Sequence, residues 1–247
     1  MEFERIADKK RLRFITSAII QNIPITGQIL DVGCGNGIIS RAIGVLGYPV
    51  TGIDSSEKAI EAARAANNLP NVNFMVVGAG EISMPPGKYA AIICSEVLEH
   101  LHKPGHLLLK LHKSLRDDGI LIVTVPNGRG PRELFVTRPV QFLQRKNLTR
   151  NMISSVKKML GYKGTTVQSS ADDLTHIQFF TYSKLTRLAW AHNFRIQKTM
   201  KSNFIEQVFP FSLLFRRSVF LQKLDCWIAD LLPRIFASGF MTVWRKY

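Results

Sequence analysis

Cysteine is scarce in this sequence: the 247 residues include only Cys34, Cys94 and Cys226. Three scattered thiols cannot build a disulfide framework of the kind that holds small secreted domains together. Their separations also match no pair of zinc-ligating cysteines. The cysteine content therefore predicts a protein of a reducing compartment, and we expect it in the cytoplasm.

Long apolar runs are also missing. A membrane-spanning helix needs roughly 18 or more apolar residues in succession, whereas the longest candidate, residues 207–215, is short and contains Pro210. Residues 1–13 mix acidic and basic side chains and lack the apolar core of an export signal. We therefore expect no transmembrane segment and no cleaved leader.

Acidic residues are few relative to basic ones. Asp and Glu total 18 against 33 Lys and Arg, which gives a formal net charge of +15. Such a charge attracts anionic partners at low salt, but it does not distinguish a nucleic acid from a phosphorylated substrate or a lipid surface. The apolar content is that of an ordinary globular protein, so the chain is expected to fold.

Short apolar runs alternate with helical stretches over the first half of the chain. A leading amphipathic helix is predicted at residues 8–23 and further helices at 56–67, 105–118 and 183–192. Strands are predicted at residues 28–32, 49–53, 72–77, 89–94, 119–125, 194–201 and 239–245. Runs this apolar are typical of strands buried on both faces. The pattern predicts an α/β fold with a Rossmann-like, seven-stranded, mostly parallel sheet and helices on both faces.

One predicted strand runs directly into a glycine-rich turn. Asp31 lies in that strand, and Gly33, Gly35 and Gly37 follow it. Glycines let a turn adopt strained dihedrals and let the backbone approach a ligand closely, while the next helix offers free N–H groups. A dinucleotide fingerprint would place its third glycine one position later, at Ile38. The turn therefore predicts a nucleotide-like cofactor other than a nicotinamide.

A second acidic residue strengthens this prediction. The following strand ends at Asp54, and Ser55 and Ser56 come next as candidate helix caps. A carboxylate at the tip of a strand can accept hydrogen bonds from both hydroxyls of a ribose. Asp54 is therefore the strongest single candidate for cofactor binding, with Ser55 beside it.

Together these segments resemble the class I S-adenosylmethionine-dependent methyltransferases, and among them the group that includes the ubiquinone-biosynthesis O-methyltransferases. The resemblance covers most of residues 28–127. It implies that Asp31 and the three glycines hold the methionine end of S-adenosylmethionine and that Asp54 binds its ribose. It also makes Glu81 and Ser95 neighbours of the cofactor.

Acidic residues and histidines cluster after the fourth predicted strand. Glu96, Glu99 and His100 would share one face of a helix that begins near Glu96, and the distant His176 could complete a cation site. The same residue types occur in metal-assisted relatives, but similar stretches also occur in many relatives without a metal. The resemblance therefore leaves open a Mg²⁺ or Zn²⁺ site made of these four residues and a structural role in which Glu99 and His100 cap a helix and pair with nearby charges. Alternatively, His100 acts as a general base without a metal, with Glu96 and His176 beside it.

Methyl transfer to a hydroxyl oxygen is the expected reaction. Deprotonation or metal coordination helps a hydroxyl to attack, and the cluster after the fourth strand offers both. Three alternatives stay open: N-methylation of a small amine, a catalytically degenerate subunit that binds the cofactor and serves a partner, and an adaptor that uses its positive charge to bind a membrane surface or nucleic acid. Acceptor screening separates the two enzymatic cases.

Two insertions interrupt a single predicted methyltransferase domain. Residues 128–175 are interpreted as a basic cap, because residues 134–171 contain Arg and Lys but no acid. Few aromatic residues accompany that charge, which argues against a nucleic-acid partner. Residues 203–238 are interpreted as a helical lid over the acceptor pocket, and their near balance of acidic and basic residues is not typical of a strongly cationic membrane helix.

The acceptor is expected to be a small molecule, a glycan or a lipid-linked molecule. The glycan and lipid-linked options rest on a looser resemblance of residues 231–240 to the ends of methyltransferases found with bacterial glycan-assembly enzymes. The positive charge adds the expectation of peripheral contact with an anionic membrane surface, at the inner face of the membrane.

Overall fold

The computed structural model describes residues 3–78, 85–138, 176–208, 210–215 and 217–247. Its centre is one seven-stranded sheet with the strand order β3-β2-β1-β4-β5-β7-β6. The strands are β1 (Ile29–Val32), β2 (Val50–Asp54), β3 (Val72–Val76), β4 (Tyr89–Ser95), β5 (Leu115–Pro126), β6 (Phe194–Lys201) and β7 (Gly239–Lys246). β7 runs in the opposite direction to the other six strands. The predicted α/β fold is confirmed.

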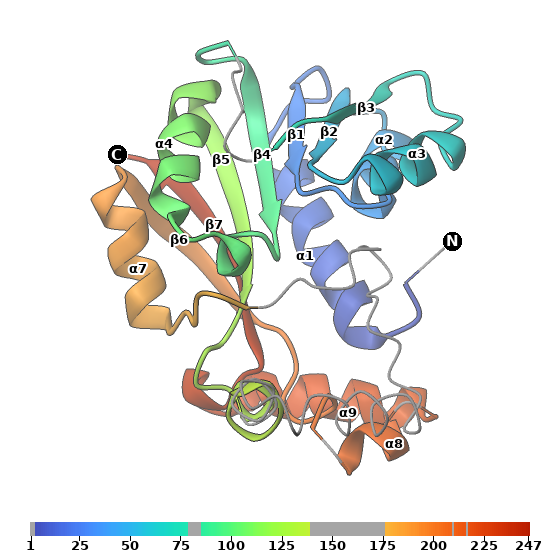
Figure 1. The fold of residues 1–247 in the computed structure, drawn as a ribbon, viewed down its shortest axis with the longest axis vertical. Helices are drawn as coiled ribbons and strands as arrows, with labels where there is room; N and C mark the ends of the chain where they lie inside the picture. Colours follow the sequence, from blue (N-terminus) through green and yellow to red (C-terminus); the bar gives the residue numbers. More distant parts are fainter. Residues whose placement is uncertain (1–2, 79–84, 139–175, 209, 216) are drawn as a thin grey trace, which may run out of the picture.

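Helices cover both faces of the sheet (Figure 1). One apolar core joins the sheet to α1 (Ile6–Asn22), α2 (Ile38–Val45) and α3 (Glu57–Ala65). A second core joins the opposite face to α4 (Pro104–Ser114) and α7 (Tyr182–Ala191). Successive strand residues point to opposite faces, so Ile29 belongs to the first core and Leu30 to the second, and both are fully buried. This double burial explains why the central strands are mostly apolar.

The helix expected at residues 105–118 is shorter than predicted. It ends at Ser114, and β5 begins at Leu115, which pairs with Tyr89 of β4. Leu115 is fully buried at this point. Tertiary packing at the start of β5 therefore outweighs the local helical periodicity.

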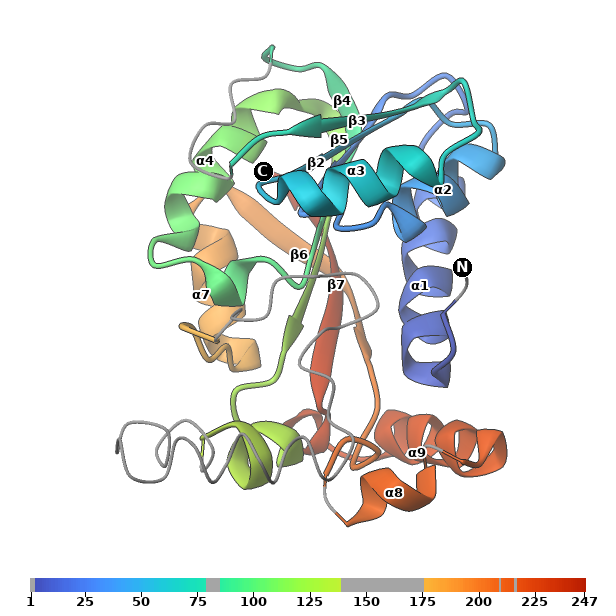
Figure 2. The same cartoon turned by 45° about the vertical axis from the view of Figure 1, so that its right-hand side comes forward.

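The chain between β6 and β7 lies beyond the carboxyl ends of β4 and β5 (Figure 2). It contains α8 (Phe211–Phe215), α9 (Val219–Leu231) and the short turn η3 (Arg234–Phe236). Another short helical turn, η2 (Glu133–Thr137), lies at the same end of the molecule (Figure 2). Lys201 pairs with Phe240, so the sheet continues directly on both sides of the insertion.

Helix α9 is anchored to the amino-terminal part of α1. The Ile6 N–H donates a hydrogen bond to the Gln222 side chain over 2.9 Å, and Lys10 pairs with Asp230 at 2.8 Å. All three cysteines are buried and unbridged. In the described ranges, no helix has both the length and the apolarity required to cross a membrane.

Candidate active site

The glycine turn after β1 has backbone conformations that only glycine adopts easily. The φ angles are +69° at Gly33 and +73° at Gly37. A Cβ atom on Gly33 would lie 2.4 Å from Val97 Cγ2, and one on Gly37 would lie 2.4 Å from the Phe74 ring. The turn therefore packs tightly against the neighbouring strands, and its Val97 contact joins it to the segment that follows β4.

Asp31 lies in β1 just before this turn and is almost completely buried. Its Oδ2 accepts a hydrogen bond of 2.6 Å from the Ser40 hydroxyl of α2. The pKa of Asp31 is raised to about 7, because burial outweighs the opposing hydrogen bond from Ser40 and the nearby Asp54 charge adds to the upward shift. A cationic group of a ligand beside Asp31 would favour the ionised carboxylate.

Asp54, at the tip of β2, links the glycine turn to the start of α3. Its Oδ2 accepts a hydrogen bond from the Gly35 N–H and its Oδ1 from the Ser56 N–H, each over 2.9 Å. Ser56 in turn caps α3 by accepting from the Ala59 N–H, whereas Ser55 is exposed and is not the cap. Each oxygen of Asp54 keeps acceptor capacity beyond these bonds, which fits a diol such as ribose.

Two other predicted cofactor neighbours have different outcomes. Ser95, at the end of β4, is buried, and its hydroxyl lies 2.9 Å from that of Thr124 in β5. Glu81 lies outside the described residues. The residues that the structure brings around the glycine turn are thus Asp31, Ser40 and Asp54.

The helix expected to begin near Glu96 does not form. Glu96 has a φ of +58°, and its N–H donates to the Thr124 carbonyl, which extends the β4–β5 ladder past the end of the strand. Only the short turn η1 (Leu98–His100) follows. The prediction that Glu96 shares a helical face with Glu99 and His100 is therefore wrong.

The Glu96 carboxylate instead faces β5 and α1. It accepts a hydrogen bond of 2.8 Å from the Thr124 hydroxyl. It also lies 3.8 Å from the Arg11 guanidinium. Arg11 thereby connects α1 to the segment after β4.

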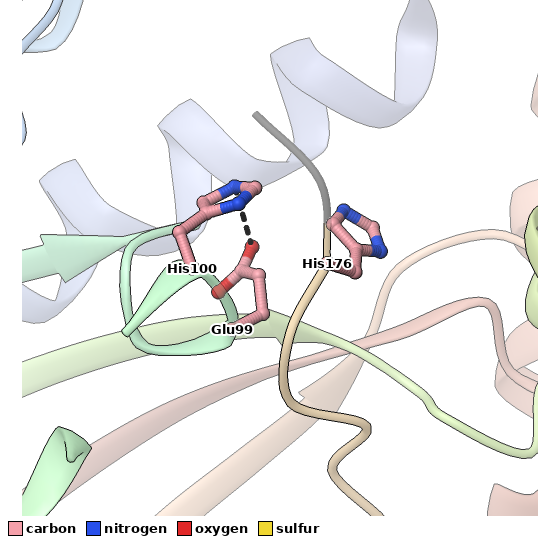
Figure 3. Close-up of side chains that lie close together, drawn as sticks. All are labelled: Glu99, His100 and His176. Carbon is pink, nitrogen blue, oxygen red and sulfur yellow. Dashed lines mark ion pairs between the residues drawn. The ribbon is translucent and has the colours of Figure 1, made fainter. Parts of the chain in front are cut away.

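Glu99, His100 and His176 form a compact group (Figure 3). One potential ligand atom from each lies within 4.8 Å of the others. The Ile177 and Gln178 N–H groups donate to the Glu99 carbonyl over 2.8 and 2.9 Å, and these bonds bring the distant chain beside η1. The imidazole rings of His100 and His176 lie 5.3 Å apart between centroids.

Glu99 is the unusual member of this group because its carboxyl is almost completely buried. His100 Nε2 lies 3.9 Å from Oε1, too far for a hydrogen bond, and neither oxygen accepts a hydrogen bond from the described part of the chain. Burial raises the pKa of Glu99 well above its ordinary value, and the charges of Glu96 and Glu133 add to this effect. A buried carboxyl in this situation needs a proton or a cation.

Glu133 joins the group from η2, and sequence reasoning missed it. The side chain is buried, and its Oε1 lies 3.2 Å from His176 Nδ1. A signal was present, because Glu133 is the single acidic residue between Asp118 and Asp172, within a stretch rich in Arg and Lys. An isolated acid in a basic segment is a candidate for a specific buried partner.

Comparison with known proteins gives a consistent picture. A family model described as a methyltransferase domain matches residues 3–199. A mitochondrial ubiquinone biosynthesis O-methyltransferase from Schizosaccharomyces pombe is 34% identical over 48% of this chain and 45% of its own length. The ubiquinone biosynthesis O-methyltransferase from Albidiferax ferrireducens is 29% identical over 68% of both chains, and that from Dechloromonas aromatica is 30% identical over 58% and 62%. The chain thus spans about half to two thirds of the length of these relatives.

Solved structures share the fold at low sequence identity. An S-adenosylmethionine-dependent methyltransferase from Mesorhizobium loti has a TM-score of 0.60 and 17% identity, covering 97% of this chain and 100% of its own. The 1,6-didemethyltoxoflavin-N1-methyltransferase from Burkholderia thailandensis, which contains S-adenosylhomocysteine, has a TM-score of 0.59 and 16% identity, covering 98% and 79%. These similarities support the arrangement of the sheet and its helices.

Proposed function

The chain belongs to the methyltransferase domain family, and from this premise we propose that it transfers the methyl group of S-adenosylmethionine to a hydroxyl oxygen of a small-molecule acceptor. The observation that carries the proposal is the group formed by Glu99, His100 and His176 at the carboxyl end of β4. A hydroxyl must lose its proton to attack, whereas a neutral amine needs less help. The group therefore favours oxygen over nitrogen as the methyl acceptor.

The glycine turn and the two acids around it fit S-adenosylmethionine. The spare acceptor capacity of Asp54 suits the ribose hydroxyls, and Asp31 suits the ammonium group of the methionine end. When bound, the cofactor supplies an electrophilic methyl group on a sulfonium. The contact between Gly33 and Val97 places this turn beside the segment that carries Glu99 and His100.

We further propose that Glu99, His100 and His176 hold a divalent cation. The donor set is one buried carboxylate and two imidazoles, which suits Zn²⁺ or a similar transition metal better than Mg²⁺. A cation would satisfy the Glu99 oxygens, and it would lower the pKa of an acceptor hydroxyl. Glu96 is not among the proposed ligands, because its carboxylate is held by Thr124 and Arg11.

The reaction is an in-line displacement. The acceptor oxygen attacks the methyl carbon, the O–C bond forms as the S–C bond breaks, and the acceptor proton leaves to a base. Glu96 is the candidate base when His100 holds a cation, because its side chain is one third exposed. In the metal-free alternative, His100 takes the proton itself.

The proposed domain organisation follows from the same arrangement. We propose that residues 1–247 form one methyltransferase domain in which residues 203–238 are a helical lid. The position of α8 and α9 beyond the carboxyl ends of β4 and β5 supports this role (Figure 2). The basic cap at residues 128–175 is described only up to residue 138. Glycan and lipid-linked hydroxyls are included among the proposed acceptors.

The test is an assay of methyl transfer from labelled S-adenosylmethionine to a panel of acceptors. We expect transfer to catechol, quinol or lipid-linked hydroxyls, a lower rate after chelation, and recovery with Zn²⁺. Turnover that resists chelation would leave His100 as the base and would contradict the cation site. Methylation of small amines with no methylation of any hydroxyl would contradict O-methylation.

Replacing Glu133 with glutamine is expected to lower turnover by roughly tenfold. The Glu133 carboxylate lies 3.2 Å from His176 Nδ1, close enough to orient the imidazole by electrostatic attraction. Partners of this kind fix the orientation and tautomer of a ligand histidine, and their loss typically costs 10- to 100-fold in metal affinity or activity. Steady-state kinetics and Zn²⁺ titration measure both effects.

The matched control for Glu133→Gln is Asp118→Asn. Asp118 is an exposed acid that pairs with Arg116. We expect wild-type turnover in this control and unchanged S-adenosylmethionine affinity in both variants. Wild-type turnover and Zn²⁺ affinity in Glu133→Gln would show that Glu133 does not position His176.

A further inference from the structure

The end of the molecule formed by α8, α9 and η3 exposes an unusual amount of apolar surface. Ten of the 22 exposed large apolar side chains among the described residues lie between positions 211 and 236. We call these ten side chains the α8–α9 face: Phe211, Leu213, Leu214, Val219, Phe220, Leu224, Trp227, Leu231, Ile235 and Phe236. Exposed apolar side chains that form a contiguous patch mark a site of interaction rather than ordinary surface.

The outer side of helix α9 is apolar, and its inner side packs against the rest of the protein. Phe220, Leu224, Trp227 and Leu231 follow one another at intervals of four, three and four residues, which places them in one stripe. The buried residues Gln222, Asp225, Cys226 and Ala229 occupy the opposite side. The exposed fractions in the stripe reach 72% at Phe220, 65% at Leu231 and 59% at Trp227.

Hydrogen bonds on the inner side of α9 keep the apolar stripe on the outer side of the helix. The Asp225 carboxylate accepts hydrogen bonds from the N–H groups of Phe204, Ile205 and Glu206, over 2.9, 2.9 and 3.3 Å. Gln222 binds the start of α1. Because its polar residues anchor the inner side of α9, the helix cannot bury the outer stripe by a simple rotation.

The charges around this face are less balanced than the sequence indicates. Glu206 and Asp225 are buried, and Asp230 pairs with Lys10 at 2.8 Å. Arg217, Lys223 and Arg234 are exposed. The near balance of acidic and basic residues in the sequence therefore does not extend to the described surface, where the acids of the segment are buried or paired while basic side chains are exposed.

We propose that the α8–α9 face docks on an anionic phospholipid surface. An apolar stripe with aromatic residues, flanked by Arg and Lys, is the pattern of helices that lie in the interface of a bilayer. Anionic headgroups complement the exposed Arg217 and Lys223, whereas the Arg234 guanidinium lies 4.2 Å from the centroid of the Tyr182 ring. Docking would turn the end of the sheet that carries Glu99, His100 and His176 toward the membrane, where lipid-linked hydroxyls are found. The docking itself does not depend on the proposed methyl transfer.

Tryptophan fluorescence provides a direct test, since the chain has three tryptophans in different surroundings. Trp244 is fully buried, Trp190 is exposed and stacks with Tyr247, and Trp227 lies in the stripe. In the full-length Trp190→Phe variant, only Trp227 can respond to a surface event. We expect phosphatidylglycerol vesicles to shift its emission to the blue and to protect it from acrylamide, and brominated lipids to quench it. Phosphatidylcholine vesicles are expected to have a much smaller effect.

Vesicle sedimentation then locates the contact. We expect Phe220→Gln combined with Trp227→Gln to reduce binding to phosphatidylglycerol vesicles by roughly tenfold or more. Trp190→Gln, which changes a tryptophan elsewhere that is 69% exposed against 59% for Trp227, should leave binding unchanged. Circular dichroism confirms that each variant is folded.

Several outcomes would overturn the proposal. Vesicle binding with Trp227 still accessible to acrylamide would place the contact elsewhere in the chain. A dimer in ultracentrifugation without lipid, abolished by the Phe220 and Trp227 substitutions, would mean that a second copy covers the face. Equal binding of the variants and wild type would also contradict it. None of these readouts involves methyl transfer, so failure of docking and failure of the enzymatic proposal are distinguishable.

Discussion

Replacing Asp54 with alanine is expected to weaken S-adenosylmethionine binding by roughly 100-fold or more. In the proposed complex, the carboxylate accepts hydrogen bonds from the ribose hydroxyls while it holds the Gly35 and Ser56 N–H groups. Hydrogen bonds to a charged group contribute about 1.5 to 3 kcal/mol each, and every 1.4 kcal/mol is about tenfold in affinity. Calorimetric titration with S-adenosylmethionine and S-adenosylhomocysteine measures the loss.

Ser56→Ala separates direct recognition from loosening of the loop. Ser56 caps α3 through its hydroxyl, and its loss is expected to cost about 1 kcal/mol of folding stability. The Ser56 backbone N–H remains in this variant and can still bind Asp54. We therefore expect Ser56→Ala to melt earlier but to bind the cofactor nearly as well as wild type. Tight cofactor binding by a folded Asp54→Ala protein would contradict the ribose assignment.

Alanine at His100 or His176 is expected to lower kcat by about 100-fold or more while leaving cofactor affinity unchanged. General acid–base groups typically contribute 10²- to 10⁴-fold, and removal of a metal ligand has effects of similar size. Both histidines belong to the group around buried Glu99. The double variant should lose little more than either single variant, because residues that act as a unit are not additive.

His106→Ala is the control for these two variants. His106 is exposed at the start of α4 and lies outside the group around Glu99. We expect it to retain wild-type kcat when measured by single-turnover transfer to the acceptor identified in the screen. If His100→Ala and His176→Ala also retained it, the proposed role of the group in acceptor activation would be wrong.

The sequence predicted the sheet well because its strands obey a local rule. A strand covered on both faces must be apolar at successive positions, and β1 and β4 are buried throughout. The glycine turn was equally readable, since the positive φ angles at Gly33 and Gly37 strongly favour glycine at those positions. In both cases the residues that reveal the structure lie close together in the sequence.

The geometry around Glu99 was less readable because it depends on contacts between distant segments. Glu96 takes a positive φ where it bonds to Thr124 of β5, and no local pattern indicates that bond. Glu133 gains its significance only from its 3.2 Å contact with His176. Spacing along the chain identified Glu96, Glu99 and His100 as residues near this site. It wrongly predicted that Glu96 lies on one helical face with the other two.

The pairing of Lys201 with Phe240 has a consequence for how such a protein diversifies. The segment that carries α8 and α9 leaves and re-enters the sheet at adjacent positions on neighbouring strands, so it is an enlarged hairpin connection. Residues can be gained, lost or exchanged there without a change in the register of β6 and β7. The same strand framework can therefore acquire new acceptors or attachment surfaces at one edge, while the Asp31 and Asp54 region evolves under separate constraints.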